Sequence, residues 1–530
     1  MIAQFLPYQS TGMFSKLVLD YLNESPEVQP FYAHSVTLEG LHAAIENRKA
    51  YPTNRNLIAS IFEAAYHEDA SSKQLENIQL LKSTNTFTVC TAHQPNIFTG
   101  YLYFIHKIFH AIRLAEELKN TFPQYDFVPI YYMGSEDNDL EELGQVKVDG
   151  VKMVWKTKQT GAVGRMKVDK SLLQIISQIE QQLCIFPHGN ALNSMLRDSY
   201  REGTTIAAAT SRLVNHLFAS YGLLVLNADE PSLKKSMLDV FKDDLLNHIP
   251  QQLVAKSITQ LEKNYKVQVN PREINLFYLK DAQRERIIFH NNIFTTESNL
   301  FHFSEDEILV ELMAYPERFS PNVVLRGLYQ ETILPNIAFI GGGAETAYWL
   351  ELKELFTHYQ VPFPVLILRN SFLIASKEQS NQLNNIGFNL EDLFQSDFEL
   401  MNQLVHKYSK NSTELLPELY SVKTIFDEIK TKAGKVDNTL LAHIEALQTQ
   451  LNKKLIGVEK KLMRAEKKKF ETLQNKLQKL KNQLFPNNSL QERQDNFMYF
   501  YAKFGKSFLD EIYHHSPSIR QEFGILIQDQ

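Results

Sequence analysis

The chain has 530 residues and a formal net charge of −6, with 44% hydrophobic and 22% charged residues. This length exceeds the roughly 250–300 residues that one hydrophobic core usually supports, so we expect a folded protein of two or three structural units. The small net charge gives no overall reason to expect binding to nucleic acid or to an anionic membrane, and two cysteines without a Cys-x-x-Cys motif exclude a disulfide framework or a thiolate zinc site.

Residues 1–85 are predicted to form a mostly helical N-terminal wrap. Apolar side chains in segments 41–47 and 56–68 recur at helical spacing, and proline-containing loops interrupt the pattern. The N-terminus shows no basic leader followed by an apolar stretch, and no uncharged apolar run reaches about 18 residues. We therefore expect a cytoplasmic protein without membrane contact.

From residue 87 onward, short β-rich runs alternate with helix-length amphipathic segments, which is the pattern of βαβ units and a parallel sheet. The expected strands are residues 87–90, 127–133, 223–227, 337–340 and 365–368. The expected helices are residues 101–119, 204–220, 231–247 and 344–358. We predict an α/β fold with a Rossmann-like parallel-sheet core over residues 86–372 and inserted connecting segments near 147–200 and 250–315.

After Arg369 the strand signal fades, and from Ile374 to about Leu484 the chain reads as almost continuously helical. Apolar residues there follow a 4-3-4-3 spacing in two runs, whose offset of one residue should alter the supercoil. The runs are Leu451, Leu455, Val458, Leu462 and Ala465, then Phe470, Leu473, Leu477, Leu480 and Leu484. We predict an α-helical coiled-coil domain over residues 373–485 and a segment over 486–530 that returns to the core.

The surface of the predicted coiled coil is basic. Between residues 453 and 481, eleven lysines and arginines face only three glutamates. Charge runs on helices usually serve solvation, so we favour an antiparallel or dimeric coiled coil over an RNA-binding arm.

Polar residues follow the first expected strand, at the sheet edge where parallel α/β folds bind ligands. They are His93, Gln94, Asn96, Thr99 and Gly100. Thr99 and Gly100 would open the following helix, whose free N–H groups suit a phosphate or carboxylate. A simple N-cap threonine and a hydrogen-bonding loop histidine explain the same residues, and Lys107 on this helix reads as a surface lysine.

Five carboxylates lie within residues 136–142, directly after the second expected strand. Such a density requires balancing cations, so Glu136, Asp137 and Asp139 are candidates to hold a substrate amine or Mg²⁺. The alternative is a set of acidic residues that decorate a helix N-terminus and stabilise its dipole.

A third polar cluster accompanies the fourth and fifth expected strands. Its members are Asn322, Arg326, Gly341, Gly342, Gly343, Glu345, Tyr348 and Arg369. Glycines directly after a strand let the backbone approach a ligand closely, although these match neither the dinucleotide nor the Walker spacing. Two arginines at one edge would suit a substrate with several carboxylates, whereas each residue alone also has a structural explanation.

Together these motifs resemble the cysteine ligase family of bacillithiol biosynthesis. The matching features are Phe98-Thr99-Gly100 with Tyr103 and Lys107, and the segments 135–142, 221–226, 320–326, 341–349 and 490–493. The resemblance implies a Rossmann-like core with inserted segments, a coiled coil that supports a homodimer, and ligation of cysteine to the amine of glucosaminyl-malate. The core is also similar to nucleotidyltransferases and class I tRNA synthetases.

The sequence departs from the family pattern at Asn138, where a histidine usually stands. An amide does not titrate near neutral pH, so Asn138 cannot serve as a general base. We expect this position not to be catalytic. The alternatives are that His93, itself glutamine or histidine in the family, takes the role, or that the substrate differs.

We hypothesise that the cleft joins the cysteine carboxyl to the amine of glucosaminyl-malate after carboxyl activation. ATP or another nucleotide and Mg²⁺ are candidate participants, and neither a tightly bound cofactor nor a metal ligand is assigned. The expected catalytic residues are His93, Glu136, Asp137 and Asp139. The expected substrate-binding residues are Gln94, Asn96, Thr99, Gly100, Tyr103, Asn322, Arg326, Gly342, Gly343, Glu345, Tyr348 and Arg369.

Two alternative functions stay open. One is another carboxylate–amine ligase or a nucleotidyltransferase-like enzyme, and the other is a non-enzymatic coiled-coil or RNA-binding protein. The expected partners are the small-molecule substrates and a second copy of the chain through the coiled coil, whereas neither a membrane nor nucleic acid is expected.

Overall fold

A five-stranded sheet forms the centre of the computed structural model, which describes residues 1–66, 70–409 and 414–528. The strands, in order across the sheet, are β13 (Val365–Leu368), β12 (Asn336–Gly341), β2 (Thr86–His93), β3 (Asp126–Met133) and β6 (Leu224–Asn227). All neighbouring strands run parallel. The five expected strands and the Rossmann-like α/β class are confirmed.

The order of the strands places a crevice beside β2. From β2 the chain first extends the sheet on one side through β3 and β6, and it later returns to the other side through β12 and β13. Loops that leave β2 and β12 therefore diverge, and ligands bind at such a switch point outside the carboxyl ends of the strands. The strands are buried on both faces, which explains why they read as continuous apolar runs.

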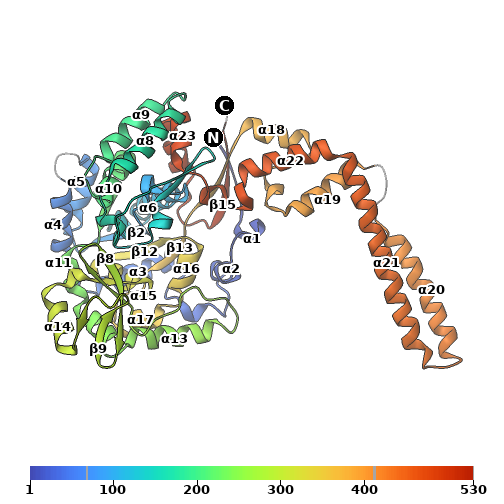
Figure 1. The fold of residues 1–530 in the computed structure, drawn as a ribbon, viewed down its shortest axis with the longest axis horizontal. Coiled ribbons are helices and arrows are strands. Elements are labelled where there is room, and N and C mark those ends of the chain that lie inside the picture. The colour runs from blue at the N-terminus through green and yellow to red at the C-terminus, as the bar shows by residue number, and fades with distance from the viewer. Residues whose placement is uncertain (67–69, 410–413, 529–530) are drawn as a thin grey trace.

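Helices cover both faces of this sheet (Figure 1). The helices that directly follow or precede core strands are α6 (Tyr103–Thr121), α10 (Ile206–Phe218), α11 (Pro231–Lys234), α12 (Leu238–Leu246), α15 (Val323–Ile333), α16 (Gly343–Trp349) and α17 (Lys353–His358). The single helices expected over 231–247 and 344–358 are each interrupted.

The N-terminal helices are α1 (Tyr8–Thr11), α2 (Lys16–Leu22), α3 (Leu38–Lys49), α4 (Arg55–Ala65) and α5 (Ser72–Leu80). The helices predicted over 41–47 and 56–68 correspond to α3 and α4, although residues 67 and 68 lie outside the described residues.

Two connecting segments interrupt the core. The first contains α7 (Leu140–Leu143), the hairpin β4 (Gln145–Val148) and β5 (Val151–Val154), α8 (Lys170–Leu183) and α9 (Gly189–Ser199). The second contains α13 (Ile249–Leu261), β7 (Leu276–Lys280), β8 (Gln283–His290), β9 (Ile293–Thr296), β10 (His302–Phe303), α14 (Glu305–Ala314) and β11 (Phe319–Pro321). Its strands form an antiparallel sheet in the order β10-β9-β8-β7-β11.

A three-stranded sheet joins the two ends of the chain. It consists of β1 (Ile2–Pro7), β15 (Glu522–Gln528) and β14 (Ser371–Ser376), with β15 in the middle. The expectation that strand structure ends after Arg369 is therefore wrong, and the N-terminal wrap begins with a strand. Each strand is short and its partners lie far away in the sequence, so local periodicity carries no sign of the pairing.

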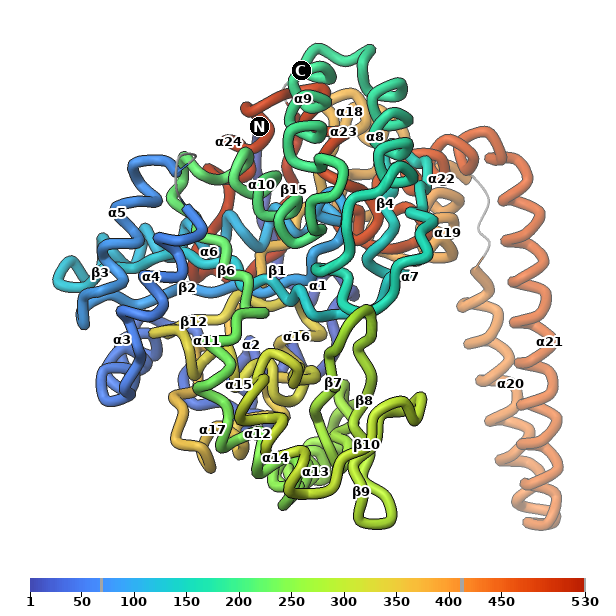
Figure 2. Tube along the Cα trace, turned by 60° about the vertical axis from the view of Figure 1, so that its left-hand side comes forward, coloured from blue at the N-terminus to red at the C-terminus, as the bar shows by residue number. Residues whose placement is uncertain are grey.

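Helices 18 to 22 form an arm that extends away from the body (Figures 1 and 2). They are α18 (Lys377–Asn385), α19 (Asp397–Tyr408), α20 (Leu416–Gly434), α21 (Leu440–Lys469) and α22 (Glu471–Leu484). Within the arm α20 packs against α21 as a hairpin. The predicted discontinuity between the two apolar runs falls at Phe470, where φ −109° and ψ 18° end α21.

After the arm the chain returns to the body through α23 (Phe497–Phe504) and α24 (Lys506–His515) before it enters β15. Among the described residues, none of the helices combines the length and the apolar character that crossing a bilayer requires.

A buried ion pair links the N-terminal helices to the core. Arg48 of α3 is 1% exposed and donates to the Glu331 carboxylate and main-chain oxygen of α15, both at 2.8 Å. Asn336 and Gln330 donate to the other oxygen of the same carboxylate. Burial raises the pKa of Glu331, and the Arg48 charge opposes that shift. The carboxylate therefore depends on Arg48 to stay ionised.

Replacement of Arg48 by Met should lower the free energy of unfolding by about 3–5 kcal/mol, because Glu331 would be left buried without a cation. The urea midpoint followed by tryptophan fluorescence measures the effect. Arg212→Met removes the same charge from an exposed position on α10 and is the matched control. Equal midpoints for the two variants would show that the pair contributes nothing.

Candidate active site

A cavity of about 570 Å³ opens at the carboxyl ends of β2, β3 and β12, where the strand order predicts a ligand crevice. Its polar and charged lining residues are His93, Gln94, Tyr103, Lys107, Tyr132, Glu136, Asp137, Glu142, Arg284, Asn322, Arg326, Glu345, Tyr348, Arg369 and Arg493. Gly342 and Gly343 complete the wall below α16. Three sequence clusters that lie up to hundreds of residues apart thus meet in one place.

Most of the predicted site residues line this cavity, whereas Asn96, Thr99, Gly100 and Asp139 do not. The helix predicted to open at Thr99 and Gly100 begins instead at Tyr103, with Leu102 as its N-cap. Phe98, Thr99 and Gly100 all have positive φ, so the chain makes a tight buried turn there that cannot start a helix. The prediction that Thr99 and Gly100 open this helix is therefore wrong.

His93 lies at the end of β2 and packs edge-on against Tyr103, with ring centroids 5.4 Å apart. Its Nε2 atom is buried and has no hydrogen-bond partner among the described residues. Burial lowers the pKa of His93 well below its ordinary value, and the nearby charges of Lys107, Arg369 and Arg326 lower it further. The imidazole is therefore neutral, and its buried Nε2 atom is left unsatisfied.

Lys107 is not the surface residue that the sequence suggests. It is 2% exposed, its Nζ donates to Ala92 O at 2.7 Å, and it forms an ion pair of 2.5 Å with Glu345. Its helix neighbours His106 and His110 are also buried, because the C-terminal segment covers that face of α6. A polar stripe on a helix is exposed to solvent only when no other segment with polar groups packs on it.

Glu345 contacts both Lys107 and the glycine turn that follows β12. Besides pairing with Lys107, its carboxylate accepts a hydrogen bond of 2.8 Å from the Gly342 N–H, which caps α16. An added Cβ on Gly341 would lie 2.9 Å from the Phe339 ring. The glycine run therefore lets the backbone turn closely beneath this carboxylate, and no positive φ is needed there.

Three arginines line the same side of the cavity. Arg369 pairs with Glu492 at 2.7 Å and lies over the Tyr103 ring at 4.9 Å. Arg326 donates to the Tyr348 hydroxyl. Arg493 comes from the C-terminal segment, and sequence reasoning missed it, although the 490–493 motif singled out its position.

The acidic loop after β3 lies on the other side. Burial raises the pKa of Glu136, and the fully buried Lys234 pairs with its carboxylate. Lys234 also approaches Asp229 at 3.5 Å, and Asp229 pairs with Arg165 at 2.6 Å. The charge balance expected from a metal or an amine is thus supplied in part by the protein itself.

The other carboxylates of this loop point to different partners. Asp137 accepts a hydrogen bond of 3.2 Å from Gln94. Asp139 caps α7 by accepting from the Glu142 N–H at 3.0 Å, which explains its place outside the cavity. Within the described residues, no group of three or more His, Cys, Asp or Glu side chains could hold a metal ion.

Asn138 connects the acidic loop to the second connecting segment. Its Oδ1 accepts from Arg284 Nη1 at 3.1 Å, and its Nδ2 donates to Arg284 O at 3.2 Å. Arg284 lies over the Phe277 ring at 3.9 Å, and both of these residues line the cavity. Asn138 itself holds β8 against the loop and does not line the cavity.

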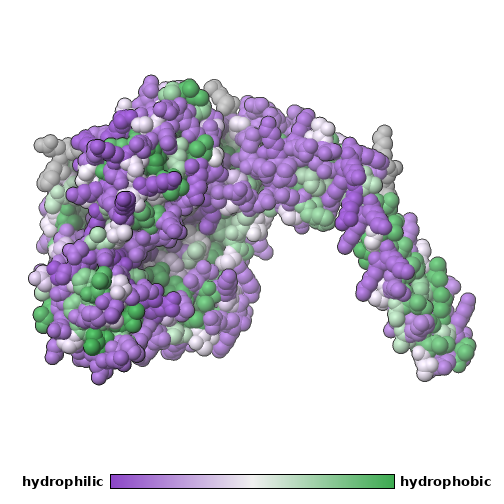
Figure 3. Space-filling model, viewed as in Figure 1, coloured by the Kyte–Doolittle hydropathy of each residue, from purple (hydrophilic) through white to green (hydrophobic). Residues whose placement is uncertain are grey.

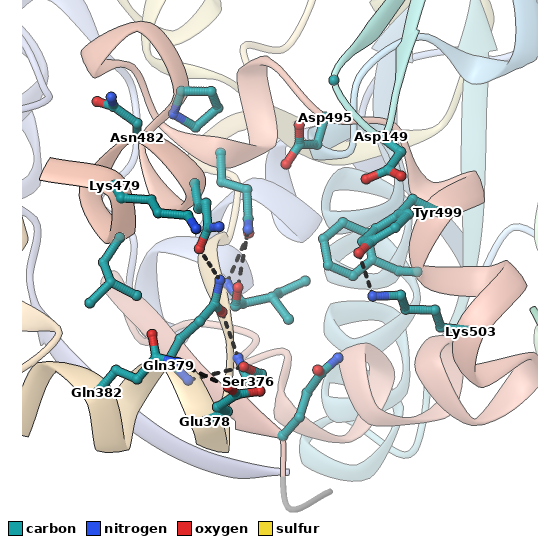
Figure 4. Close-up of a pocket in the computed structure, with 18 of the residues that line it drawn as sticks. Asp149, Ser376, Glu378, Gln379, Gln382, Lys479, Asn482, Asp495, Tyr499 and Lys503 are labelled. Carbon is teal, nitrogen blue, oxygen red and sulfur yellow. Dashed lines mark hydrogen bonds between the residues drawn. The ribbon is translucent and has the colours of Figure 1, made fainter. Parts of the chain in front are cut away.

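A larger cavity of about 980 Å³ lies between the body and the base of the arm (Figure 4). The tip of the β4–β5 hairpin, α18, α22 and α23 line it. Lys503 donates to Tyr499 there, and Ser376 caps α18 by accepting from Gln379 N. None of the predicted site residues borders this cavity, so we assign the candidate active site to the smaller one.

Two family models together cover almost the whole chain. Residues 1–370 match "Bacillithiol biosynthesis BshC, N-terminal Rossmann-like domain", and residues 372–528 match "Bacillithiol biosynthesis BshC, C-terminal coiled-coil domain". The chain belongs to the BshC family. The resemblance inferred from the sequence motifs is confirmed, and so is the coiled-coil class of the C-terminal part.

Curated relatives agree with the BshC models over the full length. The chain is 38% identical to "Putative cysteine ligase BshC" of Flavobacterium johnsoniae, covering 98% of this chain and 99% of the relative. The corresponding protein of Flavobacterium psychrophilum is also 38% identical and covers 98% of both chains. The Bacillus cytotoxicus protein of the same name is 26% identical over 83% of this chain and 86% of its own.

One solved structure, titled as an arginyl-tRNA synthetase from Campylobacter jejuni, aligns with 86% of this chain and all of its own, at 11% identity. The TM-score of 0.23 is too low for this likeness to carry an argument about the BshC fold.

The environment of His93 predicts its titration. Because burial and three neighbouring cations disfavour the imidazolium, His93 should stay neutral as the pH falls through 6.5, the ordinary pKa of a histidine. Ring C–H signals of ¹³C-histidine-labelled protein, assigned with a His93→Asn variant, report this directly. A His93 titration midpoint near 6.5 would contradict the described site.

Proposed function

We propose that this BshC-family chain is a ligase that forms an amide bond between the carboxyl group of L-cysteine and the amine of glucosaminyl-malate. Activation of the carboxyl group by ATP or another nucleotide supplies the driving force. The observation that carries the proposal is the division of charge across the cavity, with Lys107, Arg326, Arg369 and Arg493 on one side and Glu136, Asp137 and Glu142 on the other. The names of the relatives, which mark them as cysteine ligases, agree with it.

The acidic side suits the amine substrate. Carboxylates attract an ammonium group, which must lose a proton before its nitrogen can attack a carbonyl. Asp137 is only partly buried and is oriented by Gln94, so it is the better placed of the two to accept that proton. Glu136 is already paired with Lys234 and contributes mainly charge.

The cationic side suits carboxylates and the charge that develops on an activated carboxyl group. Guanidinium groups bind carboxylates through paired hydrogen bonds, and here they surround a partly closed cavity where such bonds strengthen. His93 also lines the cavity, and its neutral ring acts there as a hydrogen-bonding group without taking up a proton near neutral pH.

Purified protein incubated with cysteine, glucosaminyl-malate and ATP should yield the amide-linked thiol, detected by mass spectrometry as the sum of the two substrates minus water. Asp137→Asn should lower kcat/KM on the order of 100-fold, because the proton acceptor is removed. Glu141→Gln, which alters an exposed carboxylate of the same loop outside the cavity, is the control. No product with any nucleotide or divalent metal would overturn the substrate assignment.

We also propose that two copies pair through the arm. Apolar side chains remain exposed along α20 and α21, and they show as green patches on the arm in Figure 3. They are Leu416, Tyr420, Ile425, Ile429, Val436, Leu440, Leu447, Ile456, Val458 and Leu462. The α20–α21 hairpin thus leaves apolar side chains uncovered, and a second hairpin of the same kind would cover them.

Ile425→Glu should weaken this dimer by about 3 kcal/mol or more, since each copy loses the burial of an isoleucine worth roughly 1.5–3 kcal/mol. Sedimentation velocity across a concentration series measures the association. Ser60→Glu introduces the same charge at an exposed polar position of α4, on the body, and should leave association unchanged. A monomeric wild-type protein would refute the pairing.

A further inference from the structure

The chain segment that follows the arm reaches the wall of the candidate active site. After α22 ends at Leu484, residues 485–495 run back to the body. Gln491 fastens this segment to β14, because its side-chain oxygen accepts from Ile374 N at 3.0 Å and its side-chain nitrogen donates to Ile374 O at 3.1 Å. The next two residues, Glu492 and Arg493, are thereby held at the cavity.

Glu492 is fully buried and contacts both Arg369 and His106. One carboxylate oxygen pairs with Arg369 Nη2 at 2.7 Å, and the other contacts His106 Nδ1 at 2.9 Å and accepts from Phe372 N at 3.1 Å. Arg369 Nη1 donates to Asn370 O at 3.0 Å and to Ser371 Oγ at 3.1 Å. The charge of Arg369 is therefore compensated inside the protein, and both of its terminal nitrogens already have partners.

A charge balance of the cationic wall leaves two groups without a counter-ion. Lys107 pairs with Glu345, and Arg369 pairs with Glu492. Arg326 contacts the neutral hydroxyl of Tyr348 and the face of Tyr132, and it forms no ion pair with any of the described residues. Across the described part of the chain, the Arg493 guanidinium makes neither a hydrogen bond nor an ion pair, although it borders the cavity. Its side chain is exposed on the open side, so a ligand can reach it.

We propose that Arg493, with Arg326, binds the anionic group of the substrate, and that Arg369 shapes the wall without being the primary anion ligand. A substrate carboxylate can pair with Arg493 without displacing an internal carboxylate, so this contact costs less free energy than one with Arg369 or Lys107. The assignment rests on the proposed ligase function and deepens it, since it names the residue that would recognise the carboxylates of the malate moiety. It also makes the C-terminal domain a direct contributor to the site.

Arg493→Met should weaken binding of the probe L-malate by about 10- to 100-fold, as expected for the loss of a charge-assisted hydrogen bond. Arg493→Lys should fall between this variant and the wild type, because a lysine keeps the charge and loses the planar fork. Isothermal titration calorimetry on the full chain measures both. Arg212→Met, which removes an exposed arginine far from both cavities, should bind as the wild type does.

Steady-state kinetics separate this inference from the proposed function. In Arg493→Met the KM for glucosaminyl-malate should rise by a similar factor while kcat changes less, because the residue binds the non-reacting end of the substrate. If the wild type forms the amide product and Arg493→Met leaves both KM and L-malate affinity unchanged, Arg493 is not the anion ligand. A wild type that binds no L-malate also refutes the assignment. A wild type that forms no amide product overturns the ligase itself.

Discussion

Each charge that is buried at the carboxyl edge of the central sheet must be compensated by an opposite charge, and this requirement shapes the structure around it. An ionised group can remain in a protein interior only when it is paired and hydrogen-bonded, so each charge brought to this edge requires a partner from another segment. Glu345 forms an ion pair with Lys107, Glu492 with Arg369, and Lys234 with Glu136. These partners come from a core helix, the C-terminal segment and the first residues after β6, and they tie those segments together.

The same pairing explains the chemistry that the cavity can perform. Burial lowers the pKa of His93, and the charges of Lys107, Arg369 and Arg326 lower it further. Lys107 and Arg369 are matched by internal carboxylates, whereas Arg326 forms no ion pair among the described residues. On the opposite side Lys234 leaves Glu136 partly compensated, and Asp137 remains the more accessible carboxylate. This arrangement of charges is what motivates the proposed pair of substrates, one with an amine and one with carboxylates.

The site also shows why a chain of this length folds as one functional unit despite its arm. The arm is inserted between β14 and the segment that carries Glu492 and Arg493, so the chain leaves the body and must return to complete the cavity wall. The sheet formed by β1, β15 and β14 fastens both ends of the chain next to this return. The base of the arm is thereby joined, within a few residues of chain, to Arg493 at the cavity wall.

Local sequence patterns were enough to predict those strands and helices whose pattern lies within consecutive residues. Apolar runs such as residues 365–368 indicated core strands because both of their faces are buried, and heptad spacing indicated the long helices because it repeats along one face. Turns after strands also located His93, Glu136 and Arg369 at one edge. Only the tertiary structure decided that Lys107 is buried, that Thr99 lies outside the cavity, and that Arg493 reaches it. Those outcomes depend on which distant segment packs against each residue, and local periodicity holds no information about such contacts.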